Sequence, residues 1–91
     1  MNQQEDDYAA ISQRASAVKR AYQAELMSKA NVVGVGVGYR TMGGESTEDI
    51  ALVVMVTHKV PRAQLAPEDL VPREIEGIPV DVQEVGILRA Q

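Results

Sequence analysis

The sequence predicts an α+β fold: a long N-terminal helix packs on a small, mainly antiparallel three-stranded sheet, with a short helical turn before the last strand. Residues 3–30 contain neither proline nor glycine, which suits a long helix. Residues 33–39 alternate strictly between larger side chains and glycine, which is the period of a β-strand. Two further apolar segments, residues 50–60 and 78–82, have the length of strands. The chain, residues 1–91, has room for one domain with a single core.

The predicted helix takes up the first 30 residues, with helix-forming composition from residue 3 onward. Seven alanines lie there among glutamine, glutamate, lysine, arginine and leucine, all of which favour helix. Asn2 and Glu5 have the spacing of a capping box. Asn31 is suited to the left-handed conformation that often ends a helix.

Apolar side chains recur along this helix at spacings of three and four, as in a heptad seam. One interpretation is that the seam packs on the sheet of the same chain, and another is that it contacts other copies. Residues 3–30 would form a helix about 42 Å long, whereas a strand of eight residues spans about 27 Å. We therefore expect the helix to extend beyond the sheet. The seam comprises Tyr8, Ile11, Ala15, Val18, Tyr22 and Leu26.

The first strand has an unusual face, made only of Gly34, Gly36 and Gly38. Glycine weakens a strand, so three of them on one face need a structural reason. A face without side chains allows another backbone to approach closely. We expect a helix or a neighbouring chain to lie against it.

Gly43 and Gly44 among polar neighbours predict the turn of a β-hairpin. The strand after it, Ile50–Val60, is apolar on both faces, which predicts an interior strand covered on both sides. Residues 67–70 have proline first and acids next, which predicts one helical turn. Pro79 cannot donate a ladder hydrogen bond, so the last strand is expected at an edge. The predicted parts are therefore the helix (1–30), the hairpin, helical turn and third strand (31–86), and a tail (87–91).

Composition argues against several functional classes. The net charge is −4 and the basic residues are scattered, which disfavours binding to nucleic acid. No segment approaches the roughly 20 apolar residues that a membrane helix needs. The acidic residues 1–7 have no apolar run behind them and do not resemble a Sec signal peptide. We expect a cytoplasmic protein, unless a leaderless route exports it.

No set of residues indicates an enzyme, a cofactor site or a metal site. His58 is the only histidine and the chain has no cysteine, so most transition-metal sites are excluded. A dinucleotide-binding loop would need a third glycine where Tyr39 stands. Ser46, His58 and Asp49 could be written as a catalytic triad, but nothing fixes such a geometry. We expect no catalytic residues, no cofactor and no metal.

Three blocks of sequence carry a resemblance: residues 31–39, residues 65–72 with Pro-Glu-Asp-Leu inside, and residues 78–86 with Val-Asp-Val-Gln-Glu-Val-Gly at the end. Together, over residues 28–86, they resemble the small N-terminal domain that precedes trypsin-like peptidase domains in poorly characterised bacterial proteins. The resemblance implies a non-catalytic lead-in domain, here without the peptidase domain. None of the matching positions is a catalytic residue.

Two functional hypotheses follow. The first is a self-assembling structural subunit of a filament, tube or other homo-oligomer, using the helix, the glycine-faced strand and the tail as contacts. The second is an adaptor that docks to a separately encoded, peptidase-like or other partner. A small enzyme with a pocket at His58 and Tyr39 has less support. The expected interface residues are Tyr8, Ile11, Ala15, Val18, Tyr22, Leu26, Gly34, Gly36, Gly38, Ile87 and Leu88.

Overall fold

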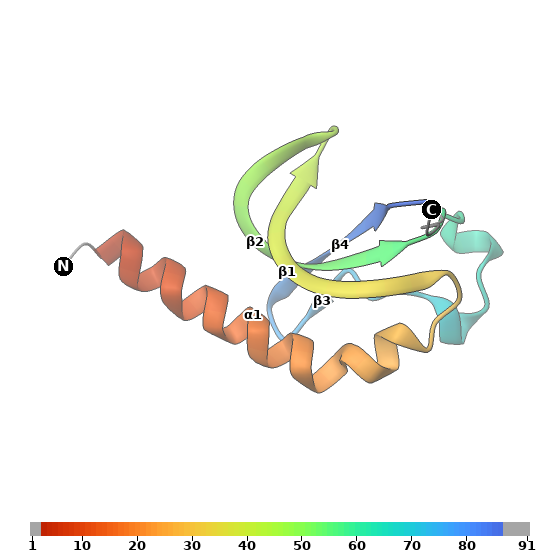
Figure 1. The fold of residues 1–91 in the computed structure, drawn as a ribbon, viewed down its shortest axis with the longest axis horizontal. Coiled ribbons are helices and arrows are strands. Elements are labelled where there is room, and N and C mark those ends of the chain that lie inside the picture. Colours follow the sequence, from red (N-terminus) through yellow and green to blue (C-terminus); the bar gives the residue numbers. More distant parts are fainter. Residues whose placement is uncertain (1–2, 87–91) are drawn as a thin grey trace, which may run out of the picture.

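A computed structural model describes residues 3–86 of the chain. It confirms the α+β class, with one long helix followed by strands and two short 3₁₀ turns (Figure 1). The elements are α1 (Gln3–Met27), β1 (Val32–Met42), β2 (Glu45–Val56), η1 (Arg62–Gln64), η2 (Pro67–Asp69), β3 (Glu74–Ile75) and β4 (Ile78–Glu84).

The sheet has four strands in the order β1-β2-β4-β3 and is mixed, so the expected three-stranded, mainly antiparallel sheet is wrong. β1 and β2 form an antiparallel hairpin, whereas β2 and β4 run parallel. The reason is the crossover, residues 57–73, which carries the chain back before β4 begins. A tight turn at Glu76 and Gly77, with φ of 50° and 83°, then pairs the two-residue β3 with β4.

α1 ends three residues earlier than expected, at Met27. The hydroxyl of Ser28 donates to the carbonyl of Glu25 at 2.6 Å, a local bond that competes with further helix. Asn31 has φ of 70° and takes the expected left-handed conformation. Of the seam, Ala15 and Leu26 are 0% and 1% exposed, so the helix packs on its own sheet.

The core lies between α1 and one face of the sheet. Alternate residues of β2 point to this face, and Leu52 and Val54 are fully buried there. Their partners on β1 are Val37 and Val35, and their partners on β4 are Val80 and Val82. β2 is therefore the interior strand, as expected, although it runs from Glu45 to Val56 and not from Ile50 to Val60.

The glycine face of β1 lies away from α1, so the expectation of a helix against it is wrong. Register pairs Gly34 with Met55 and Gly38 with Ala51, on the face opposite the core. A Cβ at Gly34 would stand 2.8 Å from the Cε of Met55, because side chains of the neighbouring strand lean over the glycines. With a register shift near each end of β1, this face becomes the concave side of a strongly curled hairpin (Figure 1).

Pro79 does not lie at an edge, because β4 is between β2 and β3. It is tolerated there because β3 is only two residues long, and Pro79 faces Glu74. The next amide, of Val80, donates to the carbonyl of Arg73 at 2.9 Å. The outer strands of the sheet are therefore β1 and the short β3.

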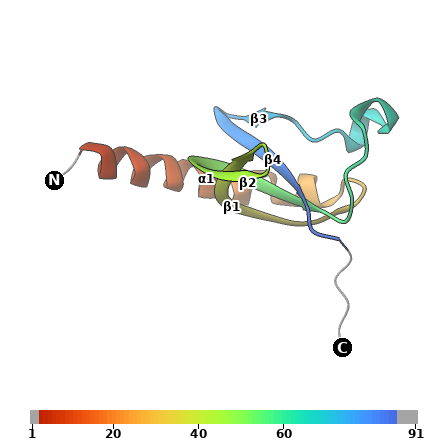
Figure 2. The ribbon, with the colours of Figure 1, turned by 90° about the horizontal axis from the view of Figure 1, so that it is seen from above.

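The described part of the chain is elongated, with principal extents of 46 × 29 × 27 Å. The N-terminal half of α1 projects past the sheet, as Figures 1 and 2 show. The crossover and the C-terminal end of α1 lie at the opposite end of the long axis. The expected overhang is confirmed.

Candidate interaction site

The projecting half of α1 carries exposed apolar side chains. Tyr8 is 45% exposed and Ile11 is 39% exposed. Tyr39, at the far end of β1, is 44% exposed and reaches the helix, where its hydroxyl lies 2.6 Å from that of Tyr8. The two rings lie 6.4 Å apart, tilted by 43°. This tyrosine pair ties the projecting helix to the hairpin.

The hydrogen bond between the two phenols raises the pKa of Tyr8 above its ordinary value, and loss of solvent and the charge of Tyr39 add to this effect. The hydroxyl of Tyr8 therefore stays protonated at neutral pH, which favours this bond. The chain can thus hold the projecting helix in place while leaving one side of it open.

A groove of about 290 Å³ runs between the projecting helix and the sheet, and we call it the helix groove. Its floor is apolar and its edge carries charges of both signs. Arg14 crosses it, donating to the carbonyl of Glu76 at 3.4 Å. The lining residues are Tyr8, Ile11, Arg14, Glu48, Asp49, Ile50, Gly77, Ile78 and Pro79.

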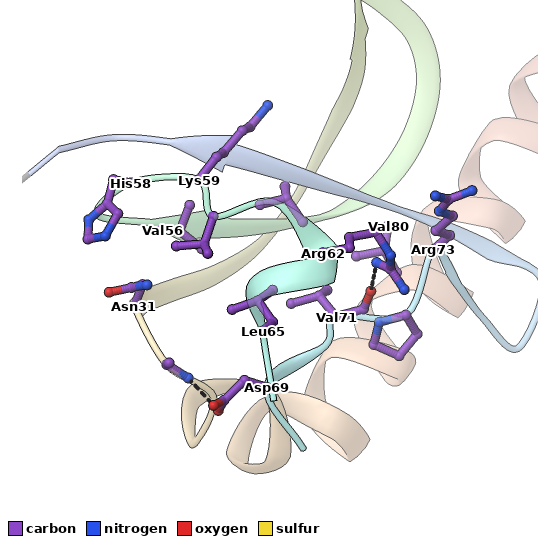
Figure 3. A pocket seen from close by; sticks show the side chains of 14 residues that line it. Asn31, Val56, His58, Lys59, Arg62, Leu65, Asp69, Val71, Arg73 and Val80 are labelled. Atoms are coloured by element: carbon purple, nitrogen blue, oxygen red, sulfur yellow. Dashed lines mark hydrogen bonds between the residues drawn. The ribbon is translucent and has the colours of Figure 1, made fainter. Parts of the chain in front are cut away.

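A second hollow, of about 280 Å³, lies at the opposite end of the molecule, and we call it the crossover pocket (Figure 3). The segment after α1, the end of β2, the crossover and β4 each contribute to its wall. Most of the wall is apolar: Ala30, Val56, Val60, Leu65, Val71, Pro72, Val80 and Val82.

Charged side chains surround the crossover pocket. Arg62 donates to the carbonyl of Val71 at 2.9 Å, and Asp69 accepts from the amide of Ala30 at 2.9 Å, as the dashed lines in Figure 3 show. These two bonds fix the crossover against the chain after α1. Lys59 and Arg73 are exposed at the same pocket, which therefore has three cations and one carboxylate among its lining residues.

Asp81 of β4 lies on the concave face of the hairpin and is hydrogen-bonded to Thr41 of β1. One carboxylate oxygen of Asp81 accepts from the amide of Thr41 at 3.0 Å and from its hydroxyl at 2.9 Å. Gln83 donates to the same oxygen at 2.9 Å. Burial raises the pKa of Asp81, but the bonds from Gln83 and Thr41 and the charge of Lys59 outweigh it, so the pKa lies below its ordinary value.

We expect Asp81→Asn to lower the free energy of unfolding at pH 7 by about 1–2 kcal/mol, because bonds to a charged acceptor are lost. A folded-state pKa below the unfolded value of about 3.9 stabilises the domain above that value, and this contribution is lost as pH falls through the folded-state pKa. The difference from the unsubstituted chain should therefore shrink between about pH 5 and pH 3 in urea titrations.

The matched control is Asp49→Asn, which removes an exposed carboxylate from the same hairpin. It should change the unfolding free energy little at either pH. An Asp81→Asn variant whose stability follows pH as the unsubstituted chain does would contradict the role given to Asp81.

Comparison with known families adds one finding. A family described as the NARROW LEAF 1 N-terminal domain matches residues 15–85, most of the chain. The chain belongs to the NARROW LEAF 1 N-terminal domain family. No curated protein matches it.

The match to the NARROW LEAF 1 N-terminal domain family begins where α1 first enters the core, at Ala15. It includes all four strands and the crossover pocket. The projecting part of α1, with Tyr8 and Ile11, precedes the matched residues.

The expected interface residues differ in burial and position in this member of the family. Ala15, Val18 and Leu26 are buried in the core, where they hold α1 on its own sheet. Tyr22 packs beside them and is half-buried. Tyr8 and Ile11 are exposed, Gly34, Gly36 and Gly38 lie on the concave face, and Ile87 and Leu88 lie outside the described residues.

The structure does not bring the possible triad together. Ser46 and Asp49 lie in the first half of β2, whereas His58 follows its end, where its Nδ1 lies 3.2 Å from the hydroxyl of Thr57. Tyr39 pairs with Ile50, far along the hairpin from His58. Between residues 3 and 86 there is no group of side chains that could hold a metal ion. The described helices include none long and apolar enough to cross a membrane.

Sequence reasoning missed the crossover pocket. Its cations lie at three separate places in the sequence, Lys59, Arg62 and Arg73, and in the sequence alone they are part of a scattered distribution of basic residues. The only local signal was the prolines of the crossover, which indicate a rigid and irregular connection. The pocket exists only because this connection folds over the ends of β2 and β4.

Proposed function

We propose that this chain is a non-catalytic structural subunit that assembles with copies of itself. The observation that carries the proposal is the projecting half of α1, which presents Tyr8 and Ile11 to solvent above the helix groove. Tyr8 uses part of its surface in the contact with Tyr39, but the exposed parts of Tyr8 and Ile11 add nothing to the stability of the chain's own fold. Burying such side chains against another copy stabilises the contact by up to about 1.5–3 kcal/mol each.

The outer edge of the sheet supports the same proposal. β1 is an outer strand of 11 residues, and Arg40 is its only charged residue. Natural edge strands usually carry charges, prolines or bulges that prevent pairing with other chains. The register shifts of β1 lie near its ends, which leaves Gly34–Tyr39 regular and open to an added strand.

A second candidate is an adaptor domain that docks to a separate partner. It is favoured by the family description, which names an N-terminal domain and so a unit joined to further chain. The peptidase-like partner suggested by the sequence resemblance belongs to this candidate. In that case the exposed face of α1 would contact the partner and not another copy.

Gel filtration with light scattering, and negative-stain microscopy of the same fraction, tests self-assembly. We expect particles much larger than the 9.9 kDa chain. Ile11→Ser should raise the concentration for half-assembly about tenfold, because losing roughly 1.4 kcal/mol per contact is a factor of ten.

Gln13→Ser is the matched control, since Gln13 is exposed on the same stretch of α1 and is not apolar. It should assemble as the unsubstituted chain does. A monomer of 9.9 kDa at every concentration would overturn self-assembly and leave the adaptor as the better proposal. A second protein purified in fixed proportion from the source cells would then support the adaptor.

A further inference from the structure

The crossover pocket combines an apolar wall with an excess of positive charge, on a chain whose net charge is −4. The one carboxylate among its lining residues, that of Asp69, is already bonded to the amide of Ala30, and the carboxylate of Glu84, beside the pocket, accepts from the amide of Lys59 at 2.8 Å. Lys59 and Arg73 are exposed there, and Arg62 stands beside them. The chemistry that fits this site is an amphipathic segment with acidic groups next to large apolar ones.

The crossover pocket has a volume of about 280 Å³. Its three cationic side chains, those of Lys59, Arg62 and Arg73, are exposed, so the pocket opens to solvent and a segment of another protein can reach it.

The N-terminal turns of α1 have the required chemistry. Residues 5–7 are all acidic, and Tyr8 and Ile11 follow. Positions three and four apart share one face of a helix, so Ile11 lies on the same face as Asp7 and Tyr8. Acidic and apolar positions therefore lie next to one another in the sequence at the N-terminal end of α1.

These turns and the crossover pocket lie at opposite ends of the 46 Å long axis (Figure 1). A chain therefore cannot fill its own pocket, whereas the next copy can. A contact between two different surfaces of the same chain repeats from copy to copy, giving an open filament or a closed ring.

We propose that the crossover pocket receives the acidic N-terminal turns of α1 from a second copy of the chain. This inference rests on the proposed self-assembly and specifies its contact. Ile11 of one copy lies against the apolar wall of the next, and the acidic first turn of α1 lies beside Lys59, Arg62 and Arg73.

Exchange of charge between the two surfaces tests the contact. The pocket variant carries Lys59→Glu and Arg73→Glu, and the helix variant carries Glu5→Lys and Asp6→Lys. Each variant alone should need at least a tenfold higher concentration to assemble, because like charges then face one another. An equal mixture should assemble again, since each surface finds an opposite charge. A chain with all four substitutions should also assemble alone.

Arg20→Glu with Arg40→Glu is the control, because both arginines are exposed and neither lines the pocket. It should leave the light-scattering mass unchanged, and circular dichroism should show every variant folded. If the pocket variant does not fold, Lys59→Gln with Arg73→Gln replaces it, and the same dissociation is expected.

The outcomes separate this inference from the proposed function. If the unsubstituted chain is monomeric, both fail. If all variants assemble as the unsubstituted chain does, self-assembly stands and the contact proposed here is overturned. If the pocket variant dissociates but neither the mixture nor the four-substitution chain recovers, another segment or a free anion occupies the pocket, and the inference is overturned.

Discussion

Val54→Asp is expected to leave no folded domain at all. Val54 is 0% exposed and lies in the middle of β2, between Val35 of β1 and Val82 of β4. A carboxylate there has no partner, and burying an unpaired charge costs several kcal/mol. The substitution also removes an aliphatic side chain whose burial stabilises the fold by about 1.5–3 kcal/mol. Since a domain of this size has a total stability of about 5–15 kcal/mol, the folded state should be lost.

Far-ultraviolet circular dichroism and urea titration at pH 7 measure this effect. Val33→Asp is the matched control, because Val33 is 45% exposed on the neighbouring strand and the new charge stays in water. The control should unfold cooperatively within about 1 kcal/mol of the unsubstituted chain. A Val54→Asp chain that unfolds with a similar midpoint would show that the core does not lie where β2 passes under α1.

Several elements of the fold could be predicted because their signals are local. The absence of proline and glycine up to Ala30 predicts α1, and Asn31 marks its end with a left-handed conformation, which the structure confirms. Gly43 and Gly44 have positive φ and form the expected hairpin turn. Alternation with period two likewise predicts β1 and most of β2, because this pattern depends only on residues that are close in the sequence.

The pairing of strands could not be predicted in this way. The residues of β4 do not determine whether it runs parallel or antiparallel to β2, because its direction depends on the path of the crossover. β3 has only two residues and no period to detect. Pro79 indicated an edge strand, but the missing amide bond is also tolerated beside so short a neighbour.

The helical seam shows a second limit of sequence reasoning. Ile11 and Val18 are seven residues apart on the same stripe, yet Ile11 is 39% exposed and Val18 is 6% exposed. Spacing places both on one face of α1 and says nothing of where the sheet ends beneath it. The overhang was expected against a strand of eight residues, whereas β1 and β2 have 11 and 12 residues. The helix still projects because the hairpin curls away from it (Figure 1). The crossover pocket depends on the tertiary structure and has no such local signal.

Leu26→Ala should have the second largest effect on stability among these substitutions. Leu26 is 1% exposed in the last turn of α1 and belongs to the core shared with β1 and β2. Cutting a fully buried leucine to alanine costs about 2–5 kcal/mol, the transfer of the lost atoms plus the cavity left behind. Urea titration should show a lower midpoint with an unchanged slope, since the surface exposed on unfolding hardly changes.

Met27→Ala is the control. Met27 follows Leu26 in the sequence but is 40% exposed, so shortening its side chain leaves no buried cavity. It should shift the unfolding free energy by less than about 0.5 kcal/mol. The contrast also tests how α1 is held. Ala15, Val18 and Leu26 are its buried contacts, so they set the direction in which the projecting turns leave the sheet. If Leu26→Ala and Met27→Ala were equally mild, α1 would not be fixed by its C-terminal turns, and its projecting end would have no defined direction for a contact with another copy.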